Sequence, residues 1–258
     1  MLISTLAAAA PAGENPYGLI PAIVEGGPLT WATAAILTIM SIGTFYILFT
    51  KVYDQQKIMG QTKKVRTTFW ASPSLKDGAA KLEKNSAYKQ IVDDALIALD
   101  QHAKLTDPVE AHDWLHGSLN RSQGAINSKL GEGLAFLATV GSTAPFIGLF
   151  GTVVGILNAL IKIGAAGQAS IDAVAGPVGE ALIMTAIGLV VAVPAVLAFN
   201  WLQRRNKAIA EDLGAFSNDL LGYMMSGGAV KPVVVSRAAP AKPVATPPKP
   251  AGVSTTKA

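Results

Sequence analysis

Three long stretches without a charged residue constrain this chain more than any other feature. They cover residues 29–50, 133–161 and 181–203. A helix rises about 1.5 Å per residue, so about 20 apolar residues cross the roughly 30 Å hydrocarbon core of a bilayer. Three such stretches favour membrane helices over the buried helices of a soluble protein. The composition agrees, because 50% of the residues are hydrophobic and only 15% are charged.

The Lys and Arg residues around these stretches predict how the chain crosses the membrane, since cytoplasmic loops are enriched in both. The first 28 residues contain neither. The basic residues that follow the first stretch are Lys51, Lys57, Lys63, Lys64 and Arg66, and those after the third are Arg204, Arg205 and Lys207. We therefore expect the N-terminus outside the cytoplasm and the C-terminus inside it. Three crossings also place the two ends of the chain on opposite sides of the membrane.

These observations predict an all-α membrane protein with three transmembrane helices and long cytoplasmic helical extensions. The expected segments, in chain order, are a tail outside the cytoplasm (1–28), a first transmembrane helix (29–50), a cytoplasmic helical domain (51–132), a second transmembrane helix (133–161), a short outer loop (162–175), a third transmembrane helix (176–203), a cytoplasmic helix (204–226) and a disordered tail rich in Pro, Ala and Lys (227–258). Gly131 and Gly133 are expected weak points where the cytoplasmic domain meets the second span. The small residues at 1–13 resemble a signal peptide, which leaves cleavage as the alternative to a retained tail.

Small residues recur along one face of each of the last two spans. In the second span the row is Gly141, Pro145, Gly148, Thr152, Gly155 and Ala159, and in the third it is Ala181, Thr185, Gly188, Ala192 and Ala195. Small faces let helices pack closely in lipid, where van der Waals contact replaces the hydrophobic driving force. We predict that Gly141, Pro145, Gly148, Gly155, Gly188 and Ala192 form a helix-packing face. Packing explains the two threonines less well, although a threonine can hydrogen-bond its own helix.

Glu180 stands just before the third apolar stretch, and its spacing allows two interpretations. In one, the carboxylate lies in the first helical turn, where the helix dipole favours it. In the other, the helix starts near Gly176 and Glu180 lies about one turn inside, where an ionisable group is a candidate functional residue. Thr185 lies five residues further, about 140° around the helix. Both can border a lumen only if it is wide, or if one of them faces a helix–helix seam.

Several functional classes find no support in the sequence. The chain has no cysteine, which excludes disulfides, Cys-ligated zinc and thiol nucleophiles. No catalytic triad, P-loop or dinucleotide motif occurs, so we expect neither an enzyme nor a cofactor. His112 and His116 have the spacing of metal ligands on a helix, but a third ligand is missing, so we expect a solvated face and no metal. Much of the basic excess lies in the Pro/Ala-rich tail, so we expect no nucleic-acid partner.

Two segments resemble a known family. GSTAPFIGLFGTVVGILNAL (141–160) and GPVGEALIMTAIGLVVAVPAVLAFN (176–200) are similar to the two signature membrane helices of the MotA/TolQ/ExbB proton-channel family. The resemblance covers roughly residues 29–225. The three-span layout with an outer N-terminus matches the ExbB and TolQ branches, of which ExbB is the nearer, whereas flagellar stator subunits have four spans.

The resemblance implies a homopentamer in the bacterial inner membrane, with ExbD-like transmembrane helices in its central lumen and a TonB-like partner. Such complexes use the proton-motive force to energise outer-membrane uptake of iron-siderophores and vitamin B12. A TolQ-like role in Tol-Pal envelope integrity is one alternative, and a structural scaffold without an ion path is another. The family's lumen-facing residues fall on Thr152, Glu180 and Thr185, with an aspartate of the ExbD-like helix as the protonated group. Separately, the basic run suggests contact of anionic phospholipid with Lys57, Lys63, Lys64 and Arg66.

Overall fold

The computed structural model describes residues 27–106, 109–166 and 171–232. Within these ranges the side chains of Lys63, Arg66, Lys162, Ala166, Glu180 and residues 171–177 are not described. Nearly all of the expected N-terminal tail (1–28) and most of the expected C-terminal tail (227–258) lie outside the described residues.

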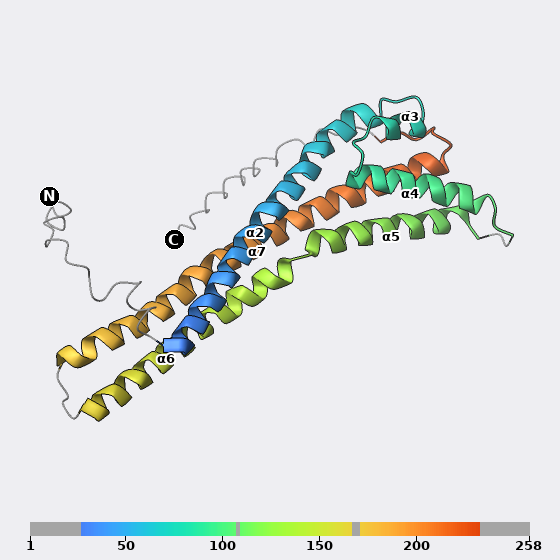
Figure 1. Ribbon diagram of the computed structural model, residues 1–258. Coiled ribbons are helices and arrows are strands. Elements are labelled where there is room, and N and C mark those ends of the chain that lie inside the picture. Colours follow the sequence, from blue (N-terminus) through green and yellow to red (C-terminus); the bar gives the residue numbers. More distant parts are fainter. Residues whose placement is uncertain (1–26, 107–108, 167–170, 233–258) are drawn as a thin grey trace, which may run out of the picture.

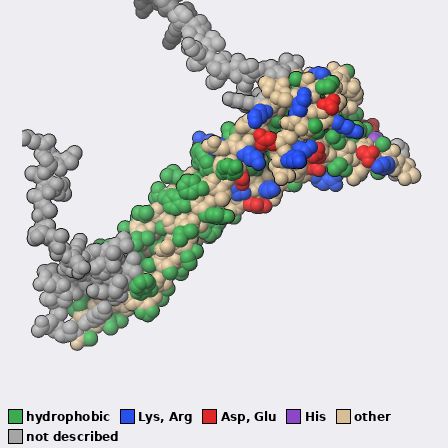
Figure 2. Space-filling model, turned by 45° about the horizontal axis from the view of Figure 1, so that its top comes forward, with side chains coloured by type: hydrophobic (Ala, Val, Ile, Leu, Met, Phe, Trp, Pro, Cys, Tyr) green, Lys and Arg blue, Asp and Glu red, His purple; other side chains and the backbone are tan. Residues whose placement is uncertain are grey.

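Three long helices form the shaft of the molecule: α2 (Gly27–Lys64), α6 (Leu134–Ala166) and α7 (Ile171–Met225). Each belongs to a helical stretch long and apolar enough to cross a membrane. They lie side by side along the shaft, and α2 and α7 continue beyond it (Figure 1). Hydrophobic side chains cover the shaft, whereas charged side chains gather at the end of the molecule beyond it, which we call the charged end (Figure 2). The prediction of an all-α fold with three candidate membrane helices is confirmed for the described residues.

The helices extend further than the uncharged stretches do. α6 continues to Ala166 and α7 begins at Ile171, so only residues 167–170 separate them. The outer loop was expected to cover 162–175, which is longer than the structure allows. The reason is that the absence of charge marks the part of a helix that lipid tolerates, whereas helical hydrogen bonding continues through the flanking polar residues.

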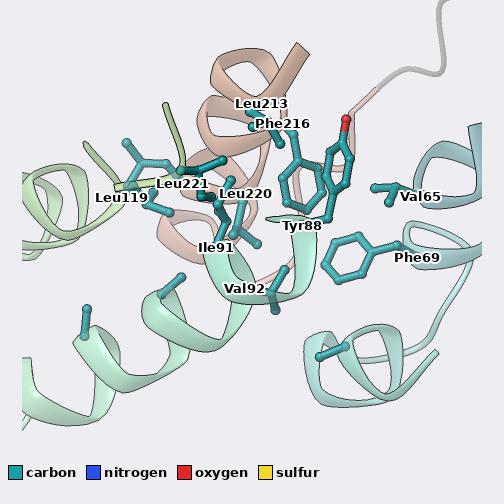
Figure 3. Packing of buried hydrophobic residues seen from close by; sticks show 14 of the residues in the cluster. Val65, Phe69, Tyr88, Ile91, Val92, Leu119, Leu213, Phe216, Leu220 and Leu221 are labelled. Carbon is teal, nitrogen blue, oxygen red and sulfur yellow. The ribbon is translucent and has the colours of Figure 1, made fainter. Parts of the chain in front are cut away.

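The charged end of the molecule has a core of its own. Around it lie the π-helical turn η1 (Val65–Phe69) and the helices α3 (Leu75–Ala80), α4 (Ala87–His102) and α5 (Ala111–Gly131). Helix α4 buries one face at helical spacing, through Tyr88, Ile91, Val92, Ala95 and Ala98. Figure 3 shows this face meeting Leu213, Phe216 and Leu220 of α7.

An aromatic cluster anchors this core to the end of α2. The ring of Phe216 lies 5.4 Å from that of Phe69 and 5.1 Å from that of Tyr88, both in edge-to-face geometry. Edge-to-face aromatic pairs contribute about 0.5–1.5 kcal/mol beyond the area that they bury. The extensions of α2 and α7 are therefore fixed to each other and to the α4–α5 hairpin.

The helical path breaks between α5 and α6, next to the expected membrane boundary. Gly133 has a φ of +82°, a conformation that favours glycine. The break leaves the last carbonyl groups of α5 without helical partners. Lys51 of α2 donates from Nζ to the Lys129 carbonyl at 2.8 Å, and Asn206 of α7 donates from Nδ2 to the Leu130 carbonyl at 2.9 Å. Two other helices thus cap the end of α5.

Gln55 connects these caps. Its side chain is fully buried, and Nε2 donates to Asn206 Oδ1 at 2.7 Å and to the Leu202 carbonyl at 3.0 Å. Asn206 in turn donates to α5, so one chain of hydrogen bonds joins α2, α7 and α5. We call Gln55, Asn206 and the carbonyls of Leu130 and Leu202 the boundary network.

We predict that Gln55→Ala destabilises the protein, because it removes the buried donor to the half-buried Asn206 side-chain oxygen and to the Leu202 carbonyl. Losing a buried hydrogen-bond partner costs about 2 kcal/mol, which corresponds to a fall in Tm of roughly 4–8 °C. The matched control is Gln56→Ala, since Gln56 is the exposed neighbour on the same helix. Thermal unfolding of the purified proteins in detergent measures both. Equal Tm values for the two variants would contradict the role given to Gln55.

Candidate functional site

The small-residue rows of α6 and α7 pack directly against each other. The closest approach is at Gly148 and Gly188. A Cβ atom at Gly148 would lie 2.6 Å from the Met184 carbonyl oxygen, and one at Gly188 would lie 2.7 Å from the Ala144 carbonyl oxygen. The two backbones are therefore in contact at this level, and neither position has room for a side chain.

The remaining members of the expected packing face lie along the same seam or close to it. A Cβ at Gly155 would lie 2.9 Å from Ala181 Cβ, and one at Gly141 would meet Val196 Cγ2 at 2.5 Å. Ala192 is buried, and Pro145 is half-buried inside α6. Within one chain, the two rows therefore meet each other along the seam.

Thr152 and Thr185 form the polar part of this seam. Thr152 is buried, and its Oγ1 lies 2.9 Å from the Ala181 carbonyl oxygen, 3.2 Å from the Gly148 carbonyl oxygen and in short contact with Thr185 Oγ1. A hydroxyl carries one proton, so Thr152 donates to one acceptor at a time. When it donates to a carbonyl, Thr185 donates to it. The two hydroxyls thus form a short hydrogen-bonded chain between α6 and α7.

Thr185 differs from Thr152 in exposure. Its side chain is only half-buried, whereas Thr152 is 94% covered, with 6% exposed. Thr152 is thus held inside the seam while Thr185 reaches its edge. The spacing left open that Glu180 or Thr185 faces a helix–helix seam, and in the single chain Thr185 lies at the edge of such a seam, hydrogen-bonded to the buried Thr152.

Glu180 lies well inside α7. The helix begins at Ile171, so Glu180 is nine residues, or more than two turns, from its start. The interpretation of Glu180 as a first-turn carboxylate is therefore wrong. The next residue, Ala181, provides the carbonyl that accepts from Thr152. Along the axis Glu180 is about 7.5 Å from Thr185, at 1.5 Å per residue. Its side chain lies outside the described part of the chain.

Sequence reasoning did not predict that α2 packs against α6 at this level of the seam. Thr33 of α2 is buried, and its Oγ1 would lie 3.3 Å from a Cβ at Gly151 of α6. Thr33 donates to the Thr30 carbonyl of its own helix at 2.8 Å. A threonine in an apolar stretch gives no signal of which neighbour it will meet, so only the packing reveals this contact.

The candidate lipid-contacting residues lie at the charged end. Lys57 and Lys64 are exposed, and the side chains of Lys63 and Arg66 lie outside the described residues. Lys64 Nζ is 3.5 Å from Glu83 Oε1. A hydrogen bond from Gln61, supported by Lys64, holds the pKa of Glu83 below its usual value. Neither lysine touches the α6–α7 seam.

The histidine pair lies on an exposed face of α5. The rings of His112 and His116 stack 5.9 Å apart on α5, and both side chains are exposed. Among the residues that the structure describes, no group of three His, Asp or Glu side chains is placed to hold an ion. The pair is a solvated face of the helix.

Comparison with known proteins places this geometry in a family. The model of the MotA/TolQ/ExbB proton channel family matches residues 84–214, which include the seam and Glu180. The biopolymer transport protein ExbB of Xanthomonas campestris pv. campestris (strain B100) is 36% identical over 253 residues, covering 90% of this chain and 100% of that protein. The ExbB of Neisseria meningitidis serogroup A is 36% identical over 202 residues, covering 76% of this chain and 92% of that protein.

A partial match extends to another branch. The Tol-Pal system protein TolQ of Haemophilus influenzae is 42% identical over 119 residues, covering 45% of this chain and 52% of that protein.

The chain belongs to the MotA/TolQ/ExbB proton channel family. It is thus a membrane protein of a proton-channel family.

We predict that Gly148→Ala weakens the α6–α7 seam, because the added methyl group would meet backbone atoms that cannot rotate away. Overpacking of this kind costs about 1–3 kcal/mol. Gly164→Ala in the same helix is the matched control, since a Cβ there would have nothing within 4 Å. Thermal unfolding in detergent should show a lower Tm for Gly148→Ala alone. A Gly148→Ala protein as stable as the control would mean that the helices do not touch here.

Proposed function

We propose that this chain is the ExbB-type subunit of an inner-membrane proton channel that energises outer-membrane transport. In this role it works with ExbD-like transmembrane helices and a TonB-like protein, and the transported substrates include iron-siderophores and vitamin B12. The observation that carries the proposal is the hydrogen-bonded pair of Thr152 and Thr185, within about two turns of Glu180 and inside the segment that the family model matches. The match to ExbB relatives over most of the chain supports the ExbB branch.

The exposed apolar surface supports assembly in a bilayer. α6 exposes Phe146, Val153 and Leu157, and α7 exposes Leu182, Val190 and Leu197. An apolar surface of this extent is covered by lipid or by other subunits. We propose a homopentameric ring in the bacterial inner membrane, with the N-terminus in the periplasm and the C-terminus in the cytoplasm. The basic residues after α2's apolar stretch support this orientation.

In this assembly the seam would provide a rigid wall with a polar edge. Contact between the backbones at Gly148 and Gly188 resists changes in the spacing of α6 and α7, while Thr185 at the edge offers a hydroxyl that donates and accepts. Glu180 would add negative charge near that edge and stabilise a passing proton. One proton crossing provides about 2.3 kcal/mol per 100 mV. A partner helix that carries a carboxylate could therefore move against the fixed ring.

A TolQ-like role in the Tol-Pal system is the second candidate, supported by the partial match to a TolQ protein. The two roles differ in their partners and in the phenotype of a deletion. Loss of siderophore-dependent growth supports the ExbB role, whereas leakage of periplasmic proteins with normal siderophore uptake supports the TolQ role.

We predict that Thr185→Val and Glu180→Gln impair siderophore uptake without preventing assembly. Removing one hydrogen bond in the path, worth about 1.4 kcal/mol, corresponds to about a tenfold lower uptake rate. The control is Thr38→Val, because Thr38 is exposed on α2 and donates only to its own helix, at 2.8 Å. Uptake of radiolabelled iron-siderophore by complemented cells gives the rate, and co-purification with the ExbD-like partner reports assembly. Normal uptake in both variants would favour a scaffold without an ion path.

A further inference from the structure

Helix α2 touches the α6–α7 seam beside the hydroxyl pair of Thr152 and Thr185. Gly151 of α6, the residue before Thr152, is buried at this point. A Cβ atom on Gly151 would lie 3.3 Å from Thr33 Oγ1 of α2 and 3.2 Å from Met184 Cβ of α7. Thr33 and Met184 are themselves buried, with 4% and 2% of their surfaces exposed. Three helices therefore pack closely around the backbone that carries Thr152.

Contacts at two different angles fix the rotation of α6 about its own axis. Gly148 and Gly151 are three residues apart, which places them about 60° apart around the helix. Gly148 meets the backbone of α7, whereas Gly151 meets side chains from both α2 and α7. Rotation of α6 toward α2 is opposed by Thr33, and rotation toward α7 is opposed by Met184. Helix α2 thus supplies one of the two stops.

The rotation of α6 decides where the hydroxyl group of Thr152 lies. Helical Cα atoms are about 2.3 Å from the axis and Oγ1 is further out, so a rotation of about 30° moves Oγ1 by more than about 1.2 Å. Thr152 Oγ1 is 2.9 Å from the Ala181 carbonyl oxygen. Hydrogen bonds between oxygen atoms are about 2.5–3.0 Å long. A rotation of this size away from α7 therefore breaks the bond and separates Thr152 from Thr185.

Thr33 reaches α6 through its shape and not through a free hydroxyl proton. Its Oγ1 donates to the Thr30 carbonyl of its own helix at 2.8 Å, and a hydroxyl has one proton to donate. Helix α2 is also held in place at the next turn. There Leu37 is fully buried in a cluster with Ala144 of α6 and Ala192 of α7. Thr33 is therefore a fixed spacer against the seam.

We propose that Thr33 is a positioning residue for the hydroxyl pair. By filling the space beside Gly151, it holds α6 in the rotation in which Thr152 meets both the Ala181 carbonyl and Thr185. Helix α2 then belongs to the working geometry of the channel and is more than a membrane anchor. The effect of Thr33 on transport rests on the proposed function, whereas its effect on the direction of the Thr152 side chain does not.

Methyl NMR of the full chain in detergent, with isotope-labelled threonine methyl groups, tests the positioning directly. The signal that disappears in Thr152→Val is that of Thr152, and its shift follows the side-chain rotamer. We expect Thr33→Ala to move this signal and Thr33→Ser, which keeps Oγ1, to leave it in place. The control is Thr38→Ala, because Thr38 is an exposed threonine of the same helix that also donates to its own backbone, at 2.8 Å. A Thr152 signal that is the same in Thr33→Ala and in the control would overturn the proposal.

A double-mutant cycle on siderophore uptake shows whether Thr33 acts through Thr152. Thr33→Ala should lower the uptake rate by up to about tenfold, the loss expected for one hydrogen bond. In a Thr152→Val background it should cause no further loss, because the hydroxyl that Thr33 positions is already absent. An equal loss in both backgrounds would refute the positioning role.

Thr33→Val separates the shape of the residue from its hydroxyl. It replaces Oγ1 with a methyl group, so it should retain more uptake than Thr33→Ala. An equal loss in the two variants would place the Thr33 hydroxyl itself in the path and contradict the proposal. If uptake is normal in every variant while the Thr152 signal still moves in Thr33→Ala, the positioning stands and the transport hypothesis fails.

Discussion

The contact between Gly148 and Gly188 is the interaction on which the membrane part of the structure depends. Lipid offers no hydrophobic force that would drive two apolar helices together, so their association needs close van der Waals contact and interhelical hydrogen bonds. The backbones meet here because neither residue has a side chain. That approach also brings Thr152 within hydrogen-bonding distance of the Ala181 carbonyl. The packing and the polar pair are thus one arrangement, since a wider seam would break both.

The boundary network stabilises the end of α5, where the charged end of the molecule meets the apolar shaft. The break at Gly133 leaves the last carbonyl groups of α5 without partners inside their own helix. Lys51 and Asn206 supply donors from two other helices, and the buried Gln55 fixes the orientation of the Asn206 amide. The apolar shaft and the core at the charged end are therefore joined by directional bonds.

Much of this organisation could be predicted from local patterns. Absence of charge located the three candidate membrane helices, and small-residue spacing located the rows that contain Gly148 and Gly188. What the sequence could not show was which surfaces meet. Gln55 and Asn206 lie 151 residues apart, so no local pattern pairs them. The expected outer loop was longer than the gap between α6 and α7, because the uncharged part of a helix and its helical hydrogen bonding end at different residues. The pore role of Thr152, Thr185 and Glu180 stays a prediction.

The seam also changes what a pore role would require of these residues. Thr152 is buried within one chain, so it cannot face a lumen unless the edge of the seam does. Thr185 is half-buried and bonded to Thr152, which makes it the side chain through which the buried hydroxyl would act. A proton or a partner's carboxylate at the lumen would then meet Thr185 first, and Thr152 would set the direction of the Thr185 hydroxyl. In this arrangement Thr152 is a positioning residue, and Thr185 and Glu180 are the groups that would contact the path.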